Sequence, residues 1–286
     1  MRIILKNKKI TFLFYIIQVI SSLILIFPLL FNNLNLINIY NFLYLNYYFS
    51  LILKLGIPPF HLWIILISNY LTWNLLFFFL TIQKIIPFYI LSLLNFNYVI
   101  FYTIILLSSF IPIFKIINLL NFKVLLTYSS INQTRWILLL IIFKNLIWLI
   151  YILFYSLILL LITKFIILFK ISFNFYINNF YSLNFNIICL FLIFNIARIP
   201  PLSFFFIKWL RLFIFLFNSK LYLIFILILI CSFILIFIYI NMLFIRMFFF
   251  SFKIKLLQNL KNSILKINFF INLFIRFFLS IFLILI

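Results

Sequence analysis

Residues 54–63 read K-L-G-I-P-P-F-H-L-W, and this stretch decides how the surrounding chain can fold. It contains the only glycine of the sequence, Gly56, the only histidine, His61, and the proline pair Pro58-Pro59. The apolar run around it is otherwise long enough to cross a membrane. Because proline lacks a backbone donor and clashes with the carbonyl one turn earlier, a helix cannot continue through both prolines. We therefore predict a broken membrane helix here.

Lys54 lies beside this predicted break, near the middle of its apolar run. Backbone groups freed by a break at membrane depth are tolerated only where protein or water covers them. A cation beside such a break is by default a candidate for function. The alternative is that the aliphatic stem of Lys54 lets its ammonium reach the membrane surface.

Apolar runs of this kind recur along the whole chain, of which 70% is hydrophobic. A soluble core does not need so many, so we predict an all-α polytopic membrane protein, with residues 1–286 as a single membrane domain. One run is too long for a single crossing and contains Pro200 and Pro201, so we predict a second broken helix and nine spans in total. The runs lie at residues 11–31, 43–67, 74–94, 98–117, 124–143, 146–169, 185–217, 221–247 and 267–286.

The charges predict the orientation of these spans. The chain has 22 Lys and Arg and no Asp or Glu, and its basic residues concentrate in the first ten residues and in alternate loops. The positive-inside rule then places residues 1–10 on the inner side, together with the loops that carry Lys115, Lys123 and Lys170. Residues 251–266 are predicted to lie on the inner membrane surface as a basic segment. No basic stripe on a soluble face indicates nucleic acid.

The same composition excludes several kinds of chemistry within the chain. One histidine and no carboxylate exclude a zinc site and a carboxylate acid/base pair, and Cys189 and Cys231 are isolated in apolar runs. We predict no catalytic residue, metal site or redox centre in this polypeptide. A buried cation must be neutral here, or be paired by lipid, by water or by another subunit.

Two further lysines lie inside predicted spans. Lys84 lies three residues before Pro87, and Lys208 lies seven residues after Pro201. The two proline pairs, one in each half of the chain, thus each have a lysine nearby. Interrupted helices in corresponding halves are typical of transporter repeats, in which the ion path passes the breaks.

Five blocks of sequence resemble one family, in that family's order. Residues 54–63 resemble the K-L-G-x-x-P-F-H-F-W stretch of mitochondrial NADH dehydrogenase subunit 2, a membrane-arm subunit of respiratory complex I. Residues 81–87, T-I-Q-K-I-I-P, resemble its T-W-Q-K-x-x-P, and residues 125–131 resemble its I-L-A-Y-S-S-I. Residues 199–209 are similar to its L-P-P-L-x-G-F-x-x-K-W, and residues 14–33 to its F-x-x-Q-x-x-x-S block ending in F-N-N.

The resemblance implies an antiporter-like fold with two inverted five-helix repeats, each with a broken helix, and a line of charged residues at mid-membrane. Lys54, Lys84 and Lys208 take the places of the family's three intramembrane lysines. His61 matches the histidine of its P-F-H motif. Tyr128, Ser129 and Ser130 match the polar residues that lie between lysines in the family.

The function implied is proton translocation within NADH:ubiquinone oxidoreductase, in the mitochondrial inner membrane with residues 1–10 and 251–266 on the matrix side. FMN, iron–sulfur clusters and quinone are then expected in other subunits. The expected partners are other membrane subunits and an anionic lipid such as cardiolipin. The alternative is a structural remnant that joins neighbouring subunits and conducts no protons.

The sequence also departs from the family. The family's glutamate, partner of its first lysine, lies on a helix upstream of Phe14, so the resemblance implies a subunit shortened at its amino terminus. The missing helices are then either lost or supplied by a separate chain. Family glycines are replaced at Arg135 and Phe204, and the glycine pair before the second proline pair is Ala197-Arg198.

Overall fold

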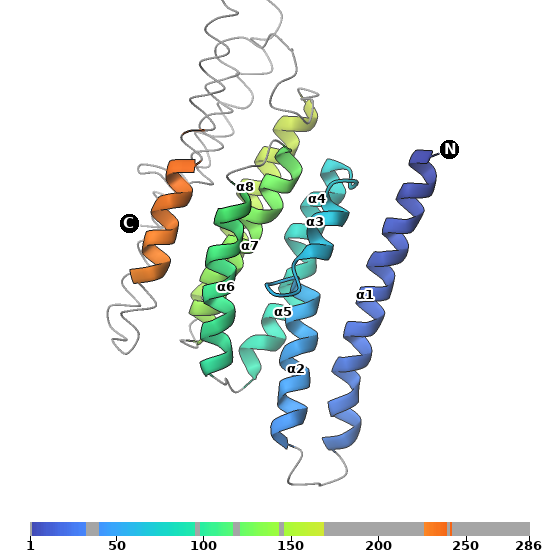
Figure 1. The fold of residues 1–286 in the computed structure, drawn as a ribbon, viewed down its shortest axis with the longest axis vertical. Coiled ribbons are helices and arrows are strands. Elements are labelled where there is room, and N and C mark those ends of the chain that lie inside the picture. Colours follow the sequence, from blue (N-terminus) through green and yellow to red (C-terminus); the bar gives the residue numbers. More distant parts are fainter. Residues whose placement is uncertain are drawn as a thin grey trace, which may run out of the picture. The chain divides into compact units, whose positions relative to one another are not determined.

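The computed structural model describes residues 2–32, 40–94, 98–116, 121–142, 146–168, 226–238 and 241. The chain divides into two compact units, Met1–Phe173 and Asn174–Ile286, and each is considered by itself. Helices α1 to α8 all belong to the first unit (Figure 1). The helix at Ile226–Ile238 belongs to the second.

The eight labelled helices follow one another with short connections. Within the described residues, three stretches are long and apolar enough to cross a membrane, namely Thr11–Pro28, Trp73–Leu93 and Ile147–Ile167. The helices of the first unit are α1 Arg2–Asn32, α2 Tyr40–Leu55, α3 Leu62–Ser68, α4 Trp73–Leu80, α5 Ile82–Leu93, α6 Tyr98–Ile116, α7 Phe122–Ile142 and α8 Ile147–Leu168.

The first expected interruption is present between α2 and α3. The helix ends one residue before Gly56, whose φ of 58° lies in the left-handed region that side chains other than glycine rarely adopt. The turn after it is closed by a bond from the Phe60 amide to the Ile57 carbonyl at 2.9 Å. A Cβ added at Gly56 would lie 1.8 Å from Cδ1 of Ile64. Both the dihedral angle and the close packing therefore require glycine.

A second interruption was not expected from the sequence, which predicts one continuous span over residues 74–94. The structure has two helices there, α4 and α5, separated by Thr81 at φ −117° and ψ −75°. The Thr81 amide and its Oγ1 both donate to the Phe77 carbonyl, at 3.1 and 2.8 Å. A threonine hydroxyl that bonds back to the preceding turn commonly bends a helix. Pro87, by contrast, lies inside α5.

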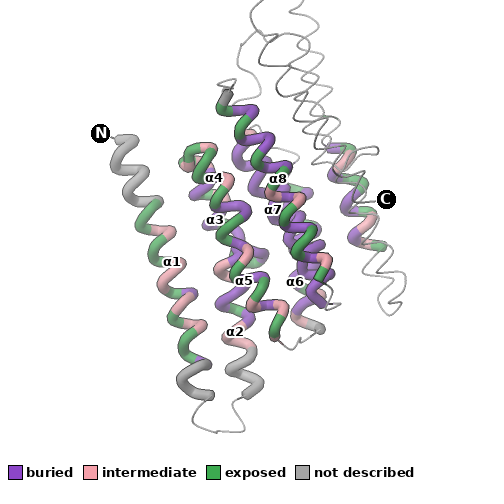
Figure 2. The backbone as a smooth tube through the Cα atoms, turned by 180° about the vertical axis from the view of Figure 1, so that it is seen from behind, coloured by how far each residue is buried: buried purple, intermediate pink, exposed green. Residues whose placement is uncertain are grey.

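Helix α7 is the centre of the first unit. It packs against α3, α5, α6 and α8, and every residue from 123 to 142 is buried (Figure 2). A helix buried on all sides is expected to be apolar all round. Instead α7 carries hydroxyl, amide and cationic side chains, which places a column of polar groups in the middle of an apolar bundle.

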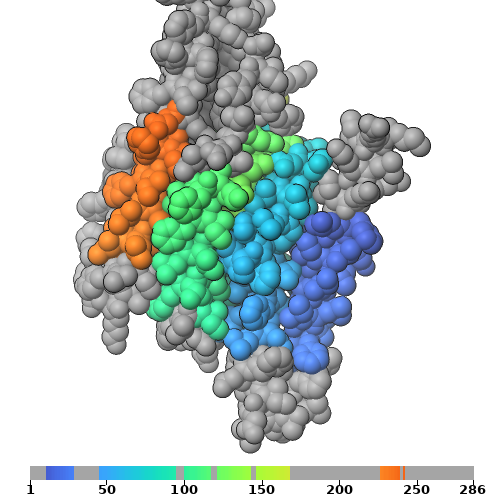
Figure 3. Space-filling view, in the orientation of Figure 1, coloured from blue at the N-terminus to red at the C-terminus, as the bar shows by residue number. Residues whose placement is uncertain are grey.

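Helix α1 lies at the edge of the unit, packed against α2 and α3. Figure 3 shows α1, then the α2–α5 stretch, then α6 across one face of this unit. The outer surface of α1 exposes large apolar side chains, among them Phe12, Tyr15 and Leu23. Such a surface suits the hydrocarbon interior of a membrane.

Several predicted features lie outside the described residues. These are the second broken helix with Pro200 and Pro201, the third lysine Lys208, and the basic segment at residues 251–266. Of residues 1–10, the structure describes the backbone of residues 2–10, which extends α1 before the predicted span.

Candidate functional site around Lys84

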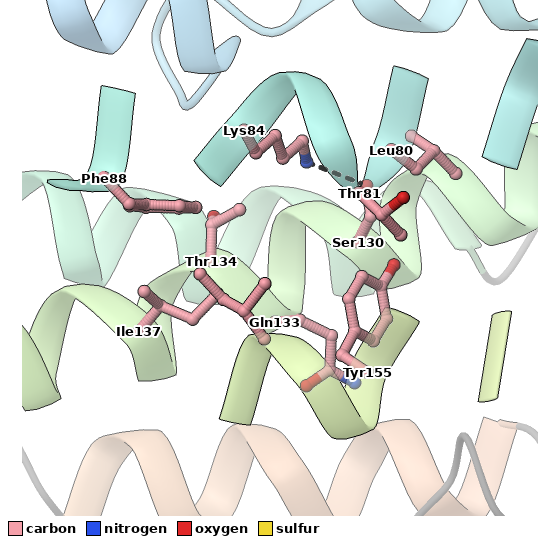
Figure 4. A pocket seen from close by; sticks show the side chains of 10 residues that line it. Leu80, Thr81, Lys84, Phe88, Ser130, Gln133, Thr134, Ile137 and Tyr155 are labelled. Atoms are coloured by element: carbon pink, nitrogen blue, oxygen red, sulfur yellow. Dashed lines mark hydrogen bonds between the residues drawn. The ribbon is translucent and has the colours of Figure 1, made fainter. Parts of the chain in front are cut away.

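Lys84 lies in the first turn of α5, directly after the Thr81 interruption. Its amide donates to the Thr81 carbonyl at 3.1 Å, which fixes the start of the helix. Its side chain is 6% exposed and points towards α7 (Figure 4). The ammonium Nζ donates to Oγ of Ser130 at 3.2 Å. The two residues are 46 positions apart, so the contact depends on how α5 packs against α7.

The orientation of the Ser130 hydroxyl follows from its second bond. Its Oγ donates to the Thr127 carbonyl at 2.7 Å, one turn earlier on α7. A hydroxyl has one proton to donate and two lone pairs to accept with. Because that proton is engaged on the backbone, Ser130 presents a lone pair to Lys84. The lysine nitrogen is therefore stabilised by an oriented dipole and not by a carboxylate.

A small cavity adjoins this contact on the side of α8. It is bordered by polar and apolar residues of α4, α5, α7 and α8, its inner surface is apolar, and its volume of about 10 Å³ is at the lower limit for one water molecule. Gln133, which lines the cavity, accepts a hydrogen bond at Oε1 from the Tyr151 hydroxyl of α8. Polar groups thus extend from α5 through α7 to α8 (Figure 4). The lining residues are Leu80, Thr81, Lys84, Phe88, Ser130, Gln133, Thr134, Ile137, Ile152 and Tyr155.

The other predicted site residues occupy separate places. Lys54 is half-buried in the last turn of α2, and His61 is buried just before α3, with Nδ1 3.2 Å from the Pro59 carbonyl oxygen. A carbonyl can only accept, so this ring nitrogen donates. Within the described part of the chain, neither residue is hydrogen-bonded to Lys84.

The predicted polar step on α7 is buried, but its members differ. Of the three, Ser130 is the one hydrogen-bonded to a lysine within the described part of the chain. The Ser129 hydroxyl donates to the Leu126 carbonyl at 2.7 Å, and Tyr128 is 5% exposed. Their parts in a proton path remain predictions.

Sequence reasoning missed two aspects of this site. Gln133 and Tyr151 meet only because α8 packs on α7, a pairing that no local pattern indicates. The charge pattern predicts Lys123 in an inner loop, but in the structure it is the second residue of α7 and is 5% exposed. The available signal for Lys123 was its spacing, since it lies four residues before Thr127 and seven before Ser130, on one side of the helix.

Two other polar residues of the described chain bear on its chemistry. Arg135 is fully buried, and its guanidinium carbon lies 5.4 Å from the centre of the Trp136 ring. Cys231 is a buried cysteine. In the described residues, no three His, Cys, Asp or Glu side chains come together as a metal site.

The fold defined by these helices is that of antiporter-like membrane subunits. It is similar to a chain of respiratory complex I from Thermus thermophilus with bound aureothin, at a TM-score of 0.69 and 18% identity. It is also similar to a chain of the Mrp complex from Dietzia sp. DQ12-45-1b, at a TM-score of 0.68 and 13% identity. No family model and no curated protein matches the sequence.

Both likenesses extend over 82% of this chain, but over only 58% of the Thermus chain and 50% of the Dietzia chain. The chain therefore spans about half the length of the structures it matches. At these identities the likeness is one of fold. The all-α, antiporter-like membrane architecture predicted from the sequence is thus confirmed.

Proposed function

We propose that this chain is a membrane-arm subunit of a proton-translocating NADH:ubiquinone oxidoreductase. Its fold resembles chains of two multi-subunit membrane complexes, one of them a respiratory complex I. The sequence blocks around Lys54, Lys84 and Lys208 favour complex I, and subunit 2 of the mitochondrial enzyme in particular. In this proposal the chain lies in the mitochondrial inner membrane with other membrane subunits and cardiolipin.

The observation that carries the proposal is the buried contact between Lys84 and Ser130. A charge at the centre of a bilayer costs about 3 kcal/mol on insertion scales, so an idle lysine is expensive to retain there. Burial disfavours the charged form of a lysine, and a nearby negative charge restores it. A lysine held by a hydroxyl dipole can thus bind or release a proton as its surroundings change.

In this mechanism the serine holds Lys84 in place and does not itself take the proton. The Ser130 proton is engaged on the Thr127 carbonyl, and a second proton on Oγ would create an oxonium. The acceptor of the Lys84 proton must then be another group, and the small cavity bordered by Gln133 and Tyr155 is the space through which a water could reach the lysine. Lys54 with His61 would precede Lys84 on the path, and Lys208 would follow it.

The redox chemistry lies outside this chain in the proposal. FMN, iron–sulfur clusters and quinone would be held by other subunits. Tyr128 and Ser129 would act as further polar steps along α7, next to Ser130.

A second candidate is a structural subunit that conducts no protons. It is favoured by the absence of Asp and Glu from the sequence, which leaves a protonated Lys54 without a carboxylate side chain in its own chain. It is opposed by Lys84, whose side chain is buried deep in the bundle and hydrogen-bonded there.

Membership of the complex can be tested by purification. The chain, tagged at one end, is isolated from membranes in mild detergent, and the eluate is assayed for NADH:quinone oxidoreductase activity and for flavin. The proposal predicts co-purification of both, compared with an unrelated tagged membrane protein. Recovery with cation-antiporter subunits and without NADH oxidation would contradict it.

A further inference from the structure

Two segments of the first unit that are far apart in sequence meet near the start of α7. Nδ2 of Asn121 donates to Oδ1 of Asn69 at 3.0 Å, and Nζ of Lys123 donates to the Leu71 carbonyl. The same Nζ lies 5.4 Å from the centre of the Trp73 ring. We name these five residues, Asn69, Leu71, Trp73, Asn121 and Lys123, the turn clamp.

The residues of the turn clamp at the start of α7 are themselves fixed by hydrogen bonds of Asn121 to the first turn of that helix. Oδ1 of Asn121 accepts from the Lys123 amide at 3.1 Å, and the Asn121 carbonyl accepts from the Leu125 amide at 3.0 Å. Asparagine in this arrangement is a strong helix cap. The backbone that carries Lys123 is therefore fixed before its side chain reaches the opposite turn.

The partners of Lys123 suit a chain without carboxylates. A backbone carbonyl and the face of a tryptophan are both electronegative, and each attracts a cation without being charged. Phe122 adds a ring contact with Trp73, at 6.3 Å between centroids. The ammonium is thus buried against α3–α4 with contacts that the first unit supplies by itself.

The clamp and the Lys84–Ser130 contact join the same two segments at different depths. Helices α4 and α7 both begin at the clamp and run in the same direction (Figure 1). Lys84 lies 11 residues beyond Trp73 and Ser130 lies seven residues beyond Lys123, about 16 and 10 Å along the helices. The bonds of Thr81 to Phe77 and of Lys84 to Thr81 connect α4 to α5 across the interruption.

We propose that Lys123 is a positioning residue: it fixes the start of α7 against the α3–α4 turn and so holds Ser130 in register with Lys84. The role of Lys123 in proton transfer rests on the proposed function. Its role in holding Ser130 opposite Lys84 does not depend on whether protons move.

The register can be measured by thiol accessibility in native membranes. Thr134 lines the cavity one turn beyond Ser130 and is 1% exposed, so Thr134→Cys places a reporter thiol there. Alkylation of the reporter thiol by a maleimide is followed by mass spectrometry in the complete complex. Buried Cys231 is measured in the same samples as a reference for general loosening.

Lys123→Met in this background is expected to raise the alkylation rate of the reporter thiol about tenfold, which corresponds to about 1.4 kcal/mol, with Cys231 unchanged. Lys123→Arg should keep the rate within about twofold of the parent, because a guanidinium can bond the same carbonyl and stack on the same ring. The matched control is Lys115→Met, which removes an exposed basic residue from α6 and should have no effect.

An unchanged rate at the reporter thiol in Lys123→Met would overturn the proposal, as would an equal rise at Cys231 or a failure of Lys123→Arg to restore the parent rate. If Lys123→Met does not assemble, Asn69→Ala is tested in its place. A rise of about threefold in the alkylation rate of the reporter thiol supports the turn clamp, and an unchanged rate overturns it. Proton pumping is recorded in parallel. If the substitutions change the alkylation rate as expected but the unmutated complex pumps no protons, the proposal about the register stands and the proposed function is refuted.

Discussion

Gly56→Ala tests the broken helix between α2 and α3. An L-residue in the left-handed region costs about 1–2 kcal/mol. The new Cβ would also lie 1.8 Å from Cδ1 and 2.4 Å from Cγ1 of Ile64, and overpacking of this kind costs about 1–3 kcal/mol. The sum, about 2–5 kcal/mol, is a large part of the stability of a typical domain.

The assay is thermal aggregation of the chain in the purified complex. For a chain of this size, a loss of about 2–5 kcal/mol in the free energy of unfolding lowers the midpoint temperature of aggregation by roughly 5–20 °C. Ser92→Ala, at an exposed serine bonded only to its own turn, is the control and should stay within about 0.5 kcal/mol of the parent.

A double mutant separates the cost of the left-handed backbone from the cost of overpacking in Gly56→Ala. Ile64→Ala removes the two side-chain atoms closest to the new Cβ and leaves Cε2 of Trp63 at 3.3 Å. It should therefore remove most of the steric part of the Gly56→Ala effect and leave the dihedral part. Additive effects of the two substitutions, or a Gly56→Ala chain as stable as the parent, would refute the reasoning about this turn.

Three further predictions concern the polar groups. Ser130→Ala should slow proton translocation by about five- to a hundredfold, because loss of a buried partner of a charge costs about 1–3 kcal/mol. The control Ser108→Ala, on α6, should not slow it. Equal translocation rates for Ser130→Ala and the parent in reconstituted vesicles would contradict this prediction. Tyr151→Phe should destabilise the chain by about 1–3 kcal/mol in the same thermal assay, while exposed Tyr89→Phe should have little effect. A carboxylate from another polypeptide is expected within one water of Lys54 in a structure of the assembly, and lipid alone around this lysine would count against its part in pumping.

The first broken helix was predictable because its cause is local. A glycine and two prolines in an apolar run leave no continuous helix, and the structure places the interruption there. The break at Thr81 had no comparable signal, since one threonine in an apolar run is compatible with an unbroken helix. It follows from a hydroxyl bonding back to its own turn, which many threonines do without ending a helix.

The candidate site was predictable only in part. The position of Lys84 in mid-span marked it from the sequence, and Ser130 followed from the resemblance. The Gln133–Tyr151 bond depends on the packing of α8 against α7, which periodicity does not encode. In the sequence, Lys123 is one basic residue among several at the ends of predicted spans. Its burial is decided by the turn that packs over it.

The most direct test of the central claim is the number of protons pumped per NADH oxidised by Lys84→Met in the purified, reconstituted complex. Methionine keeps the length and apolar stem of lysine but cannot carry a proton. Lys164→Met, at an exposed lysine on α8, is the matched control. The account predicts a clear fall in the ratio for Lys84→Met and none for Lys164→Met. An unchanged ratio in Lys84→Met, with normal assembly and NADH oxidation, would contradict a role for this chain in proton translocation.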